Sequence, residues 1–455
     1  MRLVYKFRHP LTPQLELLTH ISKNLYNEAN YFIRQEFFST GRWIRYYELN
    51  NLLKDSSYNY KLLKVQTSQQ ILRVLDKNWS SFFKAIKDWK QHPEKYNGQP
   101  RIPKYKDTHG HFMLIFTNQN CTLTTHKNIP QFRLTMSRTF KETYPQFTSP
   151  ITISIPKYPS KDFSSYQQVR ILPRRQFFEI EIVYQEKHLM NPNLDQDRYL
   201  SLDLGVNNLV TAVENRNVMP FIISGRILKS INQFWNKRRA KLLSIKDKQQ
   251  LAWTKLLDDL ITRRNSVVND FLHKAARFIV NYCLAHNIGN ICVGKLKHIK
   301  DGVNLGKKNN QNFVNIPLQK LKRMIQYKAQ LVGIAIHEVN EAYTSKCSSL
   351  DLEPLHKHKT YVGRRISRGL FRGSQYMLNA DVNGALNLLR KVIGDDFIRN
   401  LLDRGCWFQP VRIRDLIQTS HKQFLIKTGT TLVHVNKIDN LVYTVLASTE
   451  KEAIL

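Results

Sequence analysis

The sequence predicts a multidomain α/β protein, and the prediction rests on three patterns. The chain has 455 residues, which is enough for about two to four domains with cores of their own. Apolar residues recur at helical spacing between residues 13 and 89, whereas short alternating runs at residues 111–186 are typical of antiparallel strands. From residue 199 onward, patterns of buried strands alternate with long amphipathic helical patterns, as in an α/β domain.

Composition excludes several classes of protein. Hydrophobic residues make up 42% of the chain, which indicates folded cores rather than disorder. No apolar run approaches the ~20 residues needed to span a bilayer, and the first residues lack the apolar core of a secretory signal. The five cysteines are scattered without a regular framework, which fits a reducing cytosol. We therefore expect a cytoplasmic protein with no membrane partner.

The formal net charge of +35 indicates a polyanionic partner. Neutralising many phosphates releases counterions, and this release supplies most of the non-specific affinity for nucleic acid. A basic protein that binds membranes usually concentrates its charge in an amphipathic helix or a polybasic tail. Here lysine and arginine run through the whole chain, so we favour nucleic acid over a membrane surface.

The N-terminal part is predicted to combine a β-domain with inserted helices. Residues 1–9 alternate apolar and basic and form a strand that Pro10 ends. Helices then run to about Trp89, and the runs at residues 111–186 indicate an antiparallel β-barrel or sandwich. Because the first strand precedes the helices, we expect it to rejoin this sheet. Aromatic residues of the helices, such as Trp79, are expected in the core rather than stacked on bases.

A strand with a single carboxylate marks the candidate site. Residues 199–213 read YLSLDLGVNNLVTAV, an apolar run that carries Asp203 and breaks at Gly205 before it becomes apolar again. The Gly and Asn residues of the break can adopt positive φ, so we predict a tight β-hairpin. An Asp inside a buried strand is costly unless something binds it. An exposed acid at the end of a strand would also fit this pattern.

A second aspartate favours a metal-binding interpretation. Asp381 lies in NADVNGALNLLRKV (residues 379–392), at the start of a predicted amphipathic helix whose apolar side includes Leu386 and Leu389. Two Asp side chains brought together from a strand and a helix start can hold Mg²⁺, which prefers carboxylate oxygens. Such a pair is the core of a two-metal phosphodiester hydrolase.

The order of these motifs resembles that of a known family. The strand with DLG, the hairpin, a basic helical segment and a late Asp in DVNGALNLL look like the RuvC-type RNase H fold. More narrowly, the chain resembles the TnpB (OrfB) family of transposon-encoded, RNA-guided DNA nucleases, which are relatives of the type V CRISPR effectors. The runs QQILRVLDKNWSSFF, GQPRIPKYKD, RRN…LHK and AYTSK are similar to family motifs as well, and the resemblance covers roughly residues 1–395.

The resemblance also implies how the chain is divided. The expected parts are a wedge β-barrel (1–9 and 100–190), an inserted helical recognition lobe (10–99), a RuvC-like nuclease domain (196–342 and 379–395), a degenerate zinc-ribbon-like insert (343–378) and a C-terminal tail without an assigned role (396–455).

The third acid of a RuvC-like site is missing from its usual place. The family carries a Glu near the end of the strand beside the first Asp, but the corresponding segment here is ICVGKL, with Gly294 at that position. Either the acid has moved or the site is degraded. If it has moved, Glu341 near the end of the next strand would reach the space above Gly294. Glu338 is the weaker candidate, because strand alternation turns it away from the side shared by positions 337, 339 and 341.

The zinc ribbon of related proteins is also reduced. Of the expected CxxC pairs before Asp381 only Cys347 remains, with His356 and His358 nearby, so we expect no zinc. The arginines of this insert, together with residues of the PRIPKYK run and of the basic helices, are candidate nucleic-acid contacts. The set is Arg101, Lys104, Lys237, Arg238, Arg239, Arg263, Arg264, Arg364, Arg365 and Arg368.

The function that the resemblance implies is an RNA-guided DNA endonuclease of a bacterial or archaeal insertion element, of the kind commonly named a transposase. Asp203, Asp381 and Glu341 would hold two Mg²⁺ ions. The partners would be a guide RNA from the element end and double-stranded DNA with a short adjacent motif, bound by a monomer or by a dimer on one RNA. The open alternatives are a nuclease-impaired guided repressor, a miniature type V CRISPR effector and, more distantly, a structural DNA-binding protein.

Overall fold

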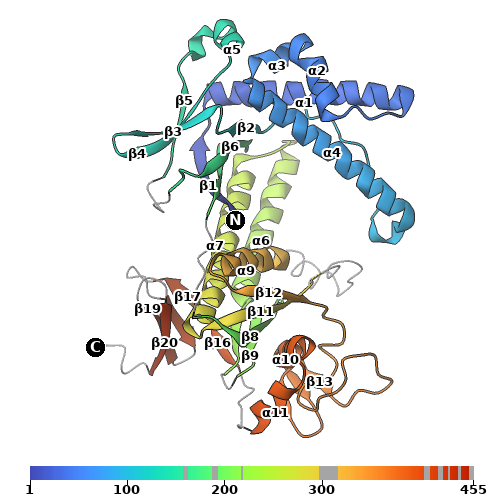
Figure 1. Ribbon diagram of the computed structural model, residues 1–455, viewed down its shortest axis with the longest axis vertical. Helices are drawn as coiled ribbons and strands as arrows, with labels where there is room; N and C mark the ends of the chain where they lie inside the picture. Colours follow the sequence, from blue (N-terminus) through green and yellow to red (C-terminus); the bar gives the residue numbers. More distant parts are fainter. Residues whose placement is uncertain are drawn as a thin grey trace. The chain divides into compact units, whose positions relative to one another are not determined.

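The computed structural model describes residues 1–156, 162–186, 193–216, 219–296, 316–403, 410–413, 415–418, 424–428, 431–438 and 442–449. The chain forms two compact units, Met1–Lys187 and His188–Leu455 (Figure 1). Within the described ranges, no helix combines the length and apolar character that crossing a membrane requires.

The strands of the first unit form two antiparallel sheets. β1 (Arg2–Pro10) pairs along its whole length with β7 (Phe177–Gln185), which confirms that the first strand rejoins the sheet after the helices. The other strands are β2 (Leu114–Thr117) and β6 (Tyr166–Pro173) in the same sheet, and β3 (Cys121–His126), β4 (Ile129–Leu134) and β5 (Ile151–Ser154) in the second sheet.

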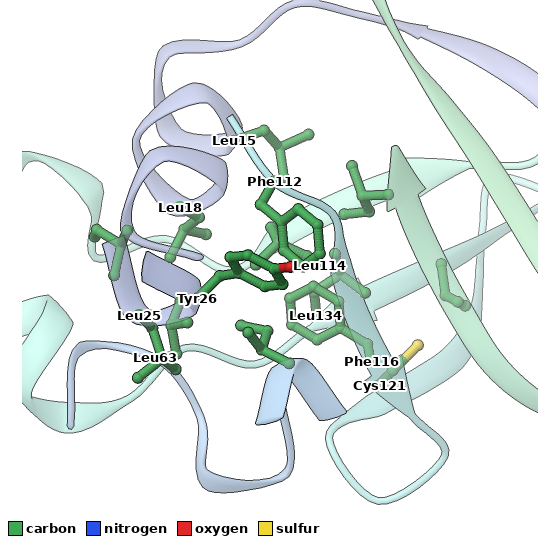
Figure 2. Packing of buried hydrophobic residues seen from close by; sticks show 14 of the residues in the cluster. Leu15, Leu18, Leu25, Tyr26, Leu63, Phe112, Leu114, Phe116, Cys121 and Leu134 are labelled. Atoms are coloured by element: carbon green, nitrogen blue, oxygen red, sulfur yellow. The ribbon is translucent and has the colours of Figure 1, made fainter. Parts of the chain in front are cut away.

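Four helices between β1 and β2 supply most of the remaining core of this unit. They are α1 (Pro13–Thr40), α2 (Tyr46–Ser56), α3 (Tyr58–Leu62) and α4 (Val65–Gln91), and a short α5 (Arg138–Thr143) follows β4. Trp79 is fully buried and its Nε1 donates to Asn30 Oδ1 at 3.0 Å, which confirms its expected core role. Figure 2 shows the ring of Tyr26 against that of Phe112, with 4.6 Å between the centroids.

The second unit is built on a six-stranded mixed sheet with the order β12-β11-β8-β9-β10-β16. β8, β11 and β12 run parallel, β9 is antiparallel to β8 and β10, and β16 is parallel to β10. The strands are β8 (Asp195–Asp203), β9 (Asn208–Glu214), β10 (Phe221–Ser224), β11 (Ile288–Gly294), β12 (Ala335–Val339) and β16 (Val411–Ile413).

Helices cover both faces of this sheet. Leu202 and Val293 pack in a cluster with residues of α7 (Lys255–Ala285) and α9 (Leu318–Leu331). Cys292 and Val339 instead pack in a cluster with α10 (Ala380–Ile393), which lies beside β8 and β9 in Figure 1. Since neighbouring residues of a strand point to opposite faces, each position on these strands can be assigned to the α7/α9 face or to the α10 face.

The remaining elements extend the second unit. α6 (Arg226–Lys248) and α7 form a long hairpin (Figure 1). The expected insert contains an antiparallel sheet of β13 (Arg364–Ser367), β14 (Leu370–Arg372) and β15 (Met377–Asn379). After α11 (Asp396–Asp403), the strand-like runs of the tail form a further antiparallel sheet, with β17 (Asp415–Gln418), β18 (Phe424–Thr428), β19 (Thr431–Ile438) and β20 (Val442–Thr449).

Candidate active site

Asp203 is the last residue of β8 and lies directly before the turn into β9, so the predicted hairpin is confirmed. The expectation of positive φ in this turn was wrong, because Gly205 is not among the glycines that adopt it. Gly205 is required for a different reason. A Cβ there would lie 2.7 Å from the carbonyl oxygen of Asn208, closer than real Cβ contacts come.

The side chain of Asp203 points to the α10 face of the sheet, because Leu202 points to the other face. Burial, together with the negative charges of Asp381 and Glu341, raises the pKa of Asp203 to about 7, against the opposing charge of Arg365. A partly buried carboxyl group with two acidic neighbours is the setting in which a bound cation would be stabilising.

Asp381 reaches the same place from the start of α10. Asn379 caps this helix by accepting hydrogen bonds from the backbone N–H groups of Asp381, at 3.0 Å, and of Val382, at 3.3 Å. The two carboxylate oxygens of Asp381 accept from Asn208 Nδ2 at 2.6 Å and from Arg365 Nη2 at 2.9 Å. Asp381 is therefore tied both to the β8–β9 hairpin and to the β13–β14 hairpin.

Helix α10 lies close to the first aspartate. A Cβ on Gly384, one helical turn after Asp381, would be 3.0 Å from Asp203 Oδ2. A larger residue at position 384 would push against this carboxylate, so the glycine permits the close approach of helix and strand.

Glu341 occupies the place that a side chain of residue 294 would fill. A Cβ built on Gly294 would lie 1.5 Å from Glu341 Oε1 and 2.3 Å from its carboxyl carbon. Gly294 pairs with Val339 across β11 and β12, and Glu341 follows Val339 by two residues, so its side chain is on the α10 face. This is the face to which Asp203 also points.

Glu338 points to the opposite face and has other partners. Its carboxylate lies 3.0 Å from Lys322 Nζ and accepts a hydrogen bond from Gln326 Nε2 at 2.6 Å. The hydrogen bond from Lys322 is the main cause that lowers the pKa of Glu338. Glu338 thus lies where strand alternation predicts, away from the face shared by Asp203 and Glu341.

The turn that carries Glu341 is held by α10. Lys391 donates to the carbonyl oxygens of Asn340, at 2.9 Å, and of Ala342, at 2.6 Å. Thr344 Oγ1 donates to the carbonyl oxygen of Glu341 at 2.8 Å. These three bonds fix the backbone on both sides of Glu341, although β12 itself ends at Val339.

The donor set has the chemistry that Mg²⁺ requires. Asp203, Asp381 and Glu341 offer carboxylate oxygens alone, which Mg²⁺ prefers. Across the described part of the chain, no three His, Cys, Asp or Glu side chains converge tightly enough to share one ion. Asn208 and Arg365 hold Asp381 in this arrangement, and a metal at Asp381 would bind beside these contacts or replace one of them.

The insert is tied together by carboxylates where related proteins are expected to have cysteines. Glu353, only 3% exposed, accepts from the backbone N–H groups of Ser348 at 2.7 Å and Val362 at 2.9 Å. Asp351 accepts from Ser348 Oγ at 2.5 Å and from the N–H of Ser374 at 3.0 Å. These bonds join the two ends of the insert. The buried Cys347 donates to the carbonyl oxygen of Pro354 at 3.4 Å, and the absence of zinc stays a prediction.

The candidate nucleic-acid contacts fall in separate places. Most are exposed: Arg101 and Lys104 beside a groove of the first unit, Lys237, Arg238, Arg239 and Arg263 on the α6–α7 hairpin, and Arg364, Arg365 and Arg368 on the β13–β14 hairpin. Arg264 differs, because its Nε and Nη2 donate to Asn232 Oδ1 at 3.0 and 2.8 Å and its guanidinium lies over the ring of Trp235. Arg264 thus joins α6 to α7.

Sequence reasoning did not single out four residues of the site. Asn208 lies in the DLGVNN run next to Asp203, so its position in the turn could have predicted a contact with the site. Lys229 donates to Asn207 Oδ1, and burial together with Arg368 lowers its pKa. For Lys322 and Lys391 the sequence offered one weak indication of a structural role: each is a lysine at a position where helical spacing favours an apolar residue.

Comparison with known proteins shows which families the chain resembles. The OrfB_IS605 family, described as a probable transposase, matches residues 180–300, and the Cas12f1-like TNB domain matches residues 319–388. Over these residues the chain is similar to the TnpB (OrfB) family and to the Cas12f type V effectors. The family resemblance inferred from the motifs is thereby confirmed.

Three relatives give the extent of the similarity. A TnpB-like protein of Methanocaldococcus jannaschii is 25% identical over 169 residues, which are 36% of this chain and 60% of that protein. A TnpB-like protein of Acidianus two-tailed virus is 22% identical over 400 residues, 84% of either chain. The CRISPR-associated endodeoxyribonuclease Cas12f1 of Sulfoacidibacillus thermotolerans is 25% identical over 213 residues, 43% of this chain and 46% of that enzyme.

A solved structure supports the fold. The protein in a Cas12f1–sgRNA–target DNA complex has a TM-score of 0.54 with this chain at 16% identity, and the match covers 82% of both chains. The protein therefore shares the mixed α/β multidomain fold of Cas12f.

Proposed function

We propose that this protein is an RNA-guided DNA endonuclease whose RuvC-like site uses Glu341 as a relocated third acid. The observation that carries the proposal is that the Glu341 carboxylate fills the space above Gly294, on the sheet face to which Asp203 points. The acid that is missing from β11 is thus supplied from the end of β12. The parallel order of β8, β11 and β12, with β9 antiparallel to β8, is that of an RNase H fold and supports this class of nuclease.

Each residue of the site has a role in this proposal. Asp203, Asp381 and Glu341 would hold two Mg²⁺ ions, which when bound supply an activated water and stabilise the leaving oxygen. Asn208 orients the Asp381 carboxylate from the β8–β9 turn. Arg365, now paired with Asp381, lies where its guanidinium can turn to the phosphate of a bound strand.

The partners follow from charge and family. A net charge of +35 fits a guide RNA from the element end and a target DNA duplex with a short adjacent motif. The first unit would supply a wedge and a recognition lobe, and the exposed Arg101 and Lys104 would contact a phosphate backbone. A monomer, or a dimer on one RNA, would act in the prokaryotic cytoplasm.

A second function has specific support and needs to be tested. Both oxygens of Asp381 already have protein partners, and β11 carries no acid at its end. A site in which Arg365 stays on Asp381 would bind a guided target without cutting it, and the protein would then act as a roadblock or repressor.

Plasmid cleavage with the co-expressed element-end RNA separates the two functions. We expect Mg²⁺-dependent cleavage by the unmodified protein, and its loss in Asp203→Ala and Asp381→Ala while guided DNA binding persists. Guided binding without cleavage by the unmodified protein would support the repressor instead. Cleavage that survives Asp203→Ala would contradict both assignments of the site.

A further inference from the structure

A lysine occupies a core position of α9, behind the candidate site. Leu318, Leu321 and Ile325 are buried at helical spacing, and the side chain of Lys322 on the same side of the helix is only 1% exposed. Burying an ammonium group costs several kcal/mol unless charged and polar partners replace the lost water. An apolar residue would fill the position without this cost, so packing alone does not account for the lysine.

The partners of Lys322 lie at the ends of two neighbouring strands. Its Nζ donates to the carbonyl oxygen of Gly294, the last residue of β11, at 2.9 Å. The same Nζ is 3.0 Å from Glu338 Oε2 on β12. Lys322 therefore joins the carboxyl ends of β11 and β12, the two strands that bring Gly294 and Glu341 together.

The bond to Gly294 bears directly on Glu341. The Glu341 carboxylate lies where a Cβ of Gly294 would be, so the orientation of the Gly294 peptide defines the space that Glu341 fills. Burial raises the pKa of Glu341, and the charge of Lys322 opposes this rise. Lys322 is thus the positively charged neighbour of Glu341, whereas Asp203, its neighbour in the site, is an acid.

We propose that Lys322 is a positioning residue for Glu341: it fixes the Gly294 peptide at the end of β11, so that the Glu341 carboxylate stays on the α10 face of the sheet. This inference rests on the proposed function, in which Glu341 is a metal ligand. Lys322 acts through Gly294 and Glu341 and does not itself contact DNA or metal.

The test is guided plasmid cleavage over a range of Mg²⁺ concentrations, with guided DNA binding as the measure of folding. In Lys322→Met we expect the Mg²⁺ concentration for half-maximal cleavage to rise by about 10-fold or more, with a smaller loss of the maximal rate, because a supporting residue of a metal ligand typically contributes 10–100-fold in metal affinity. Lys322→Arg should recover part of this loss, since its guanidinium can donate to the same carbonyl. If Lys322→Met loses guided binding, Lys322→Gln takes its place with the same expectation.

Glu338→Gln is the matched control, since it removes the charge of the other partner of Lys322 but keeps an acceptor. We expect its Mg²⁺ dependence to stay within about threefold of the unmodified protein, below the effect of a supporting residue. The inference is overturned if Lys322→Met changes the Mg²⁺ dependence no more than Glu338→Gln. It is also overturned if adding Glu338→Gln to Lys322→Met restores the original dependence, because the defect then comes from an unpaired Glu338.

Different results would rule out the third acid and the role of Lys322. If Glu341→Gln cleaves at the original Mg²⁺ concentration, the proposed third acid is wrong, and Lys322 then has no acid to position. If Glu341→Gln is inactive but Lys322→Met cleaves normally, the acid stands and only the role of Lys322 is wrong.

Discussion

Asp203 should destabilise the metal-free protein, so its replacement by Asn should raise the melting temperature. Burial, with the negative charges of Asp381 and Glu341, raises the pKa of Asp203 from an ordinary 3.8 to about 7. Each pKa unit corresponds to about 1.4 kcal/mol, so the ionised carboxylate costs the folded state about 4 kcal/mol. An amide of the same shape carries no charge and avoids most of this penalty.

The pH dependence of this effect has a defined sign. Because the pKa of Asp203 is higher in the folded state than in the unfolded state, the penalty is absent below about pH 4 and complete above about pH 7. At pH 5.5 about half of the penalty remains. The advantage of Asp203→Asn should therefore be largest at pH 8 and about half as large at pH 5.5.

Thermal unfolding followed by fluorescence can test this in EDTA at both pH values. Asp203→Asn should melt higher than the unmodified protein, and Mg²⁺ should raise the melting temperature of the unmodified protein but not of the variant. Asp197→Asn, an exposed position on the same strand, should change neither. The reasoning is refuted if Asp203→Asn melts at or below the temperature of the unmodified protein at pH 8, or if Mg²⁺ stabilises both proteins equally.

Three further predictions concern other residues. Gly294→Ala should lower guided cleavage by about two orders of magnitude with little change in melting temperature, because the added Cβ displaces only the flexible end of the Glu341 side chain. In the control Gly289→Ala the Cβ would meet a backbone oxygen at 2.6 Å, so the melting temperature should fall instead. A fall in melting temperature for Gly294→Ala but not for Gly289→Ala would contradict the geometry. Arg263→Ala should reduce the slope of the logarithm of the nucleic-acid binding constant against the logarithm of the salt concentration by about one. Arg264→Ala should instead lower the free energy of unfolding by about 1–3 kcal/mol through its lost hydrogen bonds. The distinction is refuted if the two variants change the salt slope and the stability equally. Elemental analysis should find no stoichiometric zinc in the purified protein, and Asp351→Ala should lower its melting temperature. One tightly bound zinc per chain would contradict an insert that is held together by hydrogen bonds to carboxylates.

Much of the fold could be predicted because the patterns were local. The strand at residues 1–9 alternates clearly, and only the strands after the helices offered it a partner. The burial of the strand at residues 288–294 and the helix that begins near Asp381 were readable from apolar spacing alone. The turn after Asp203 was placed correctly, but its backbone conformation was not, because a close approach to Asn208 rather than positive φ requires Gly205.

The site was harder to predict because it depends on contacts between distant segments. Strand alternation placed Glu341 and Glu338 on opposite faces, but which face holds Asp203 depends on where α10 packs. β12 also ends two residues before Glu341, so alternation alone does not hold this acid on the α10 face, and the bonds from Lys391 to the turn contribute to its position. Arg264 looked like any other cation of a basic helix, and only the packing of α6 on α7 shows that it is held by Asn232.

The central claim is that Glu341 supplies the acid that Gly294 cannot, and returning the acid to β11 tests it most directly. The assay is guided plasmid cleavage in Mg²⁺ and in EDTA by the unmodified protein, by Glu341→Gln and by the double variant Gly294→Glu with Glu341→Ala. We predict Mg²⁺-dependent cleavage by the unmodified protein, none by Glu341→Gln, and partial recovery in the double variant, whose new Glu enters the space that Glu341 has left. Full cleavage by Glu341→Gln would contradict the account.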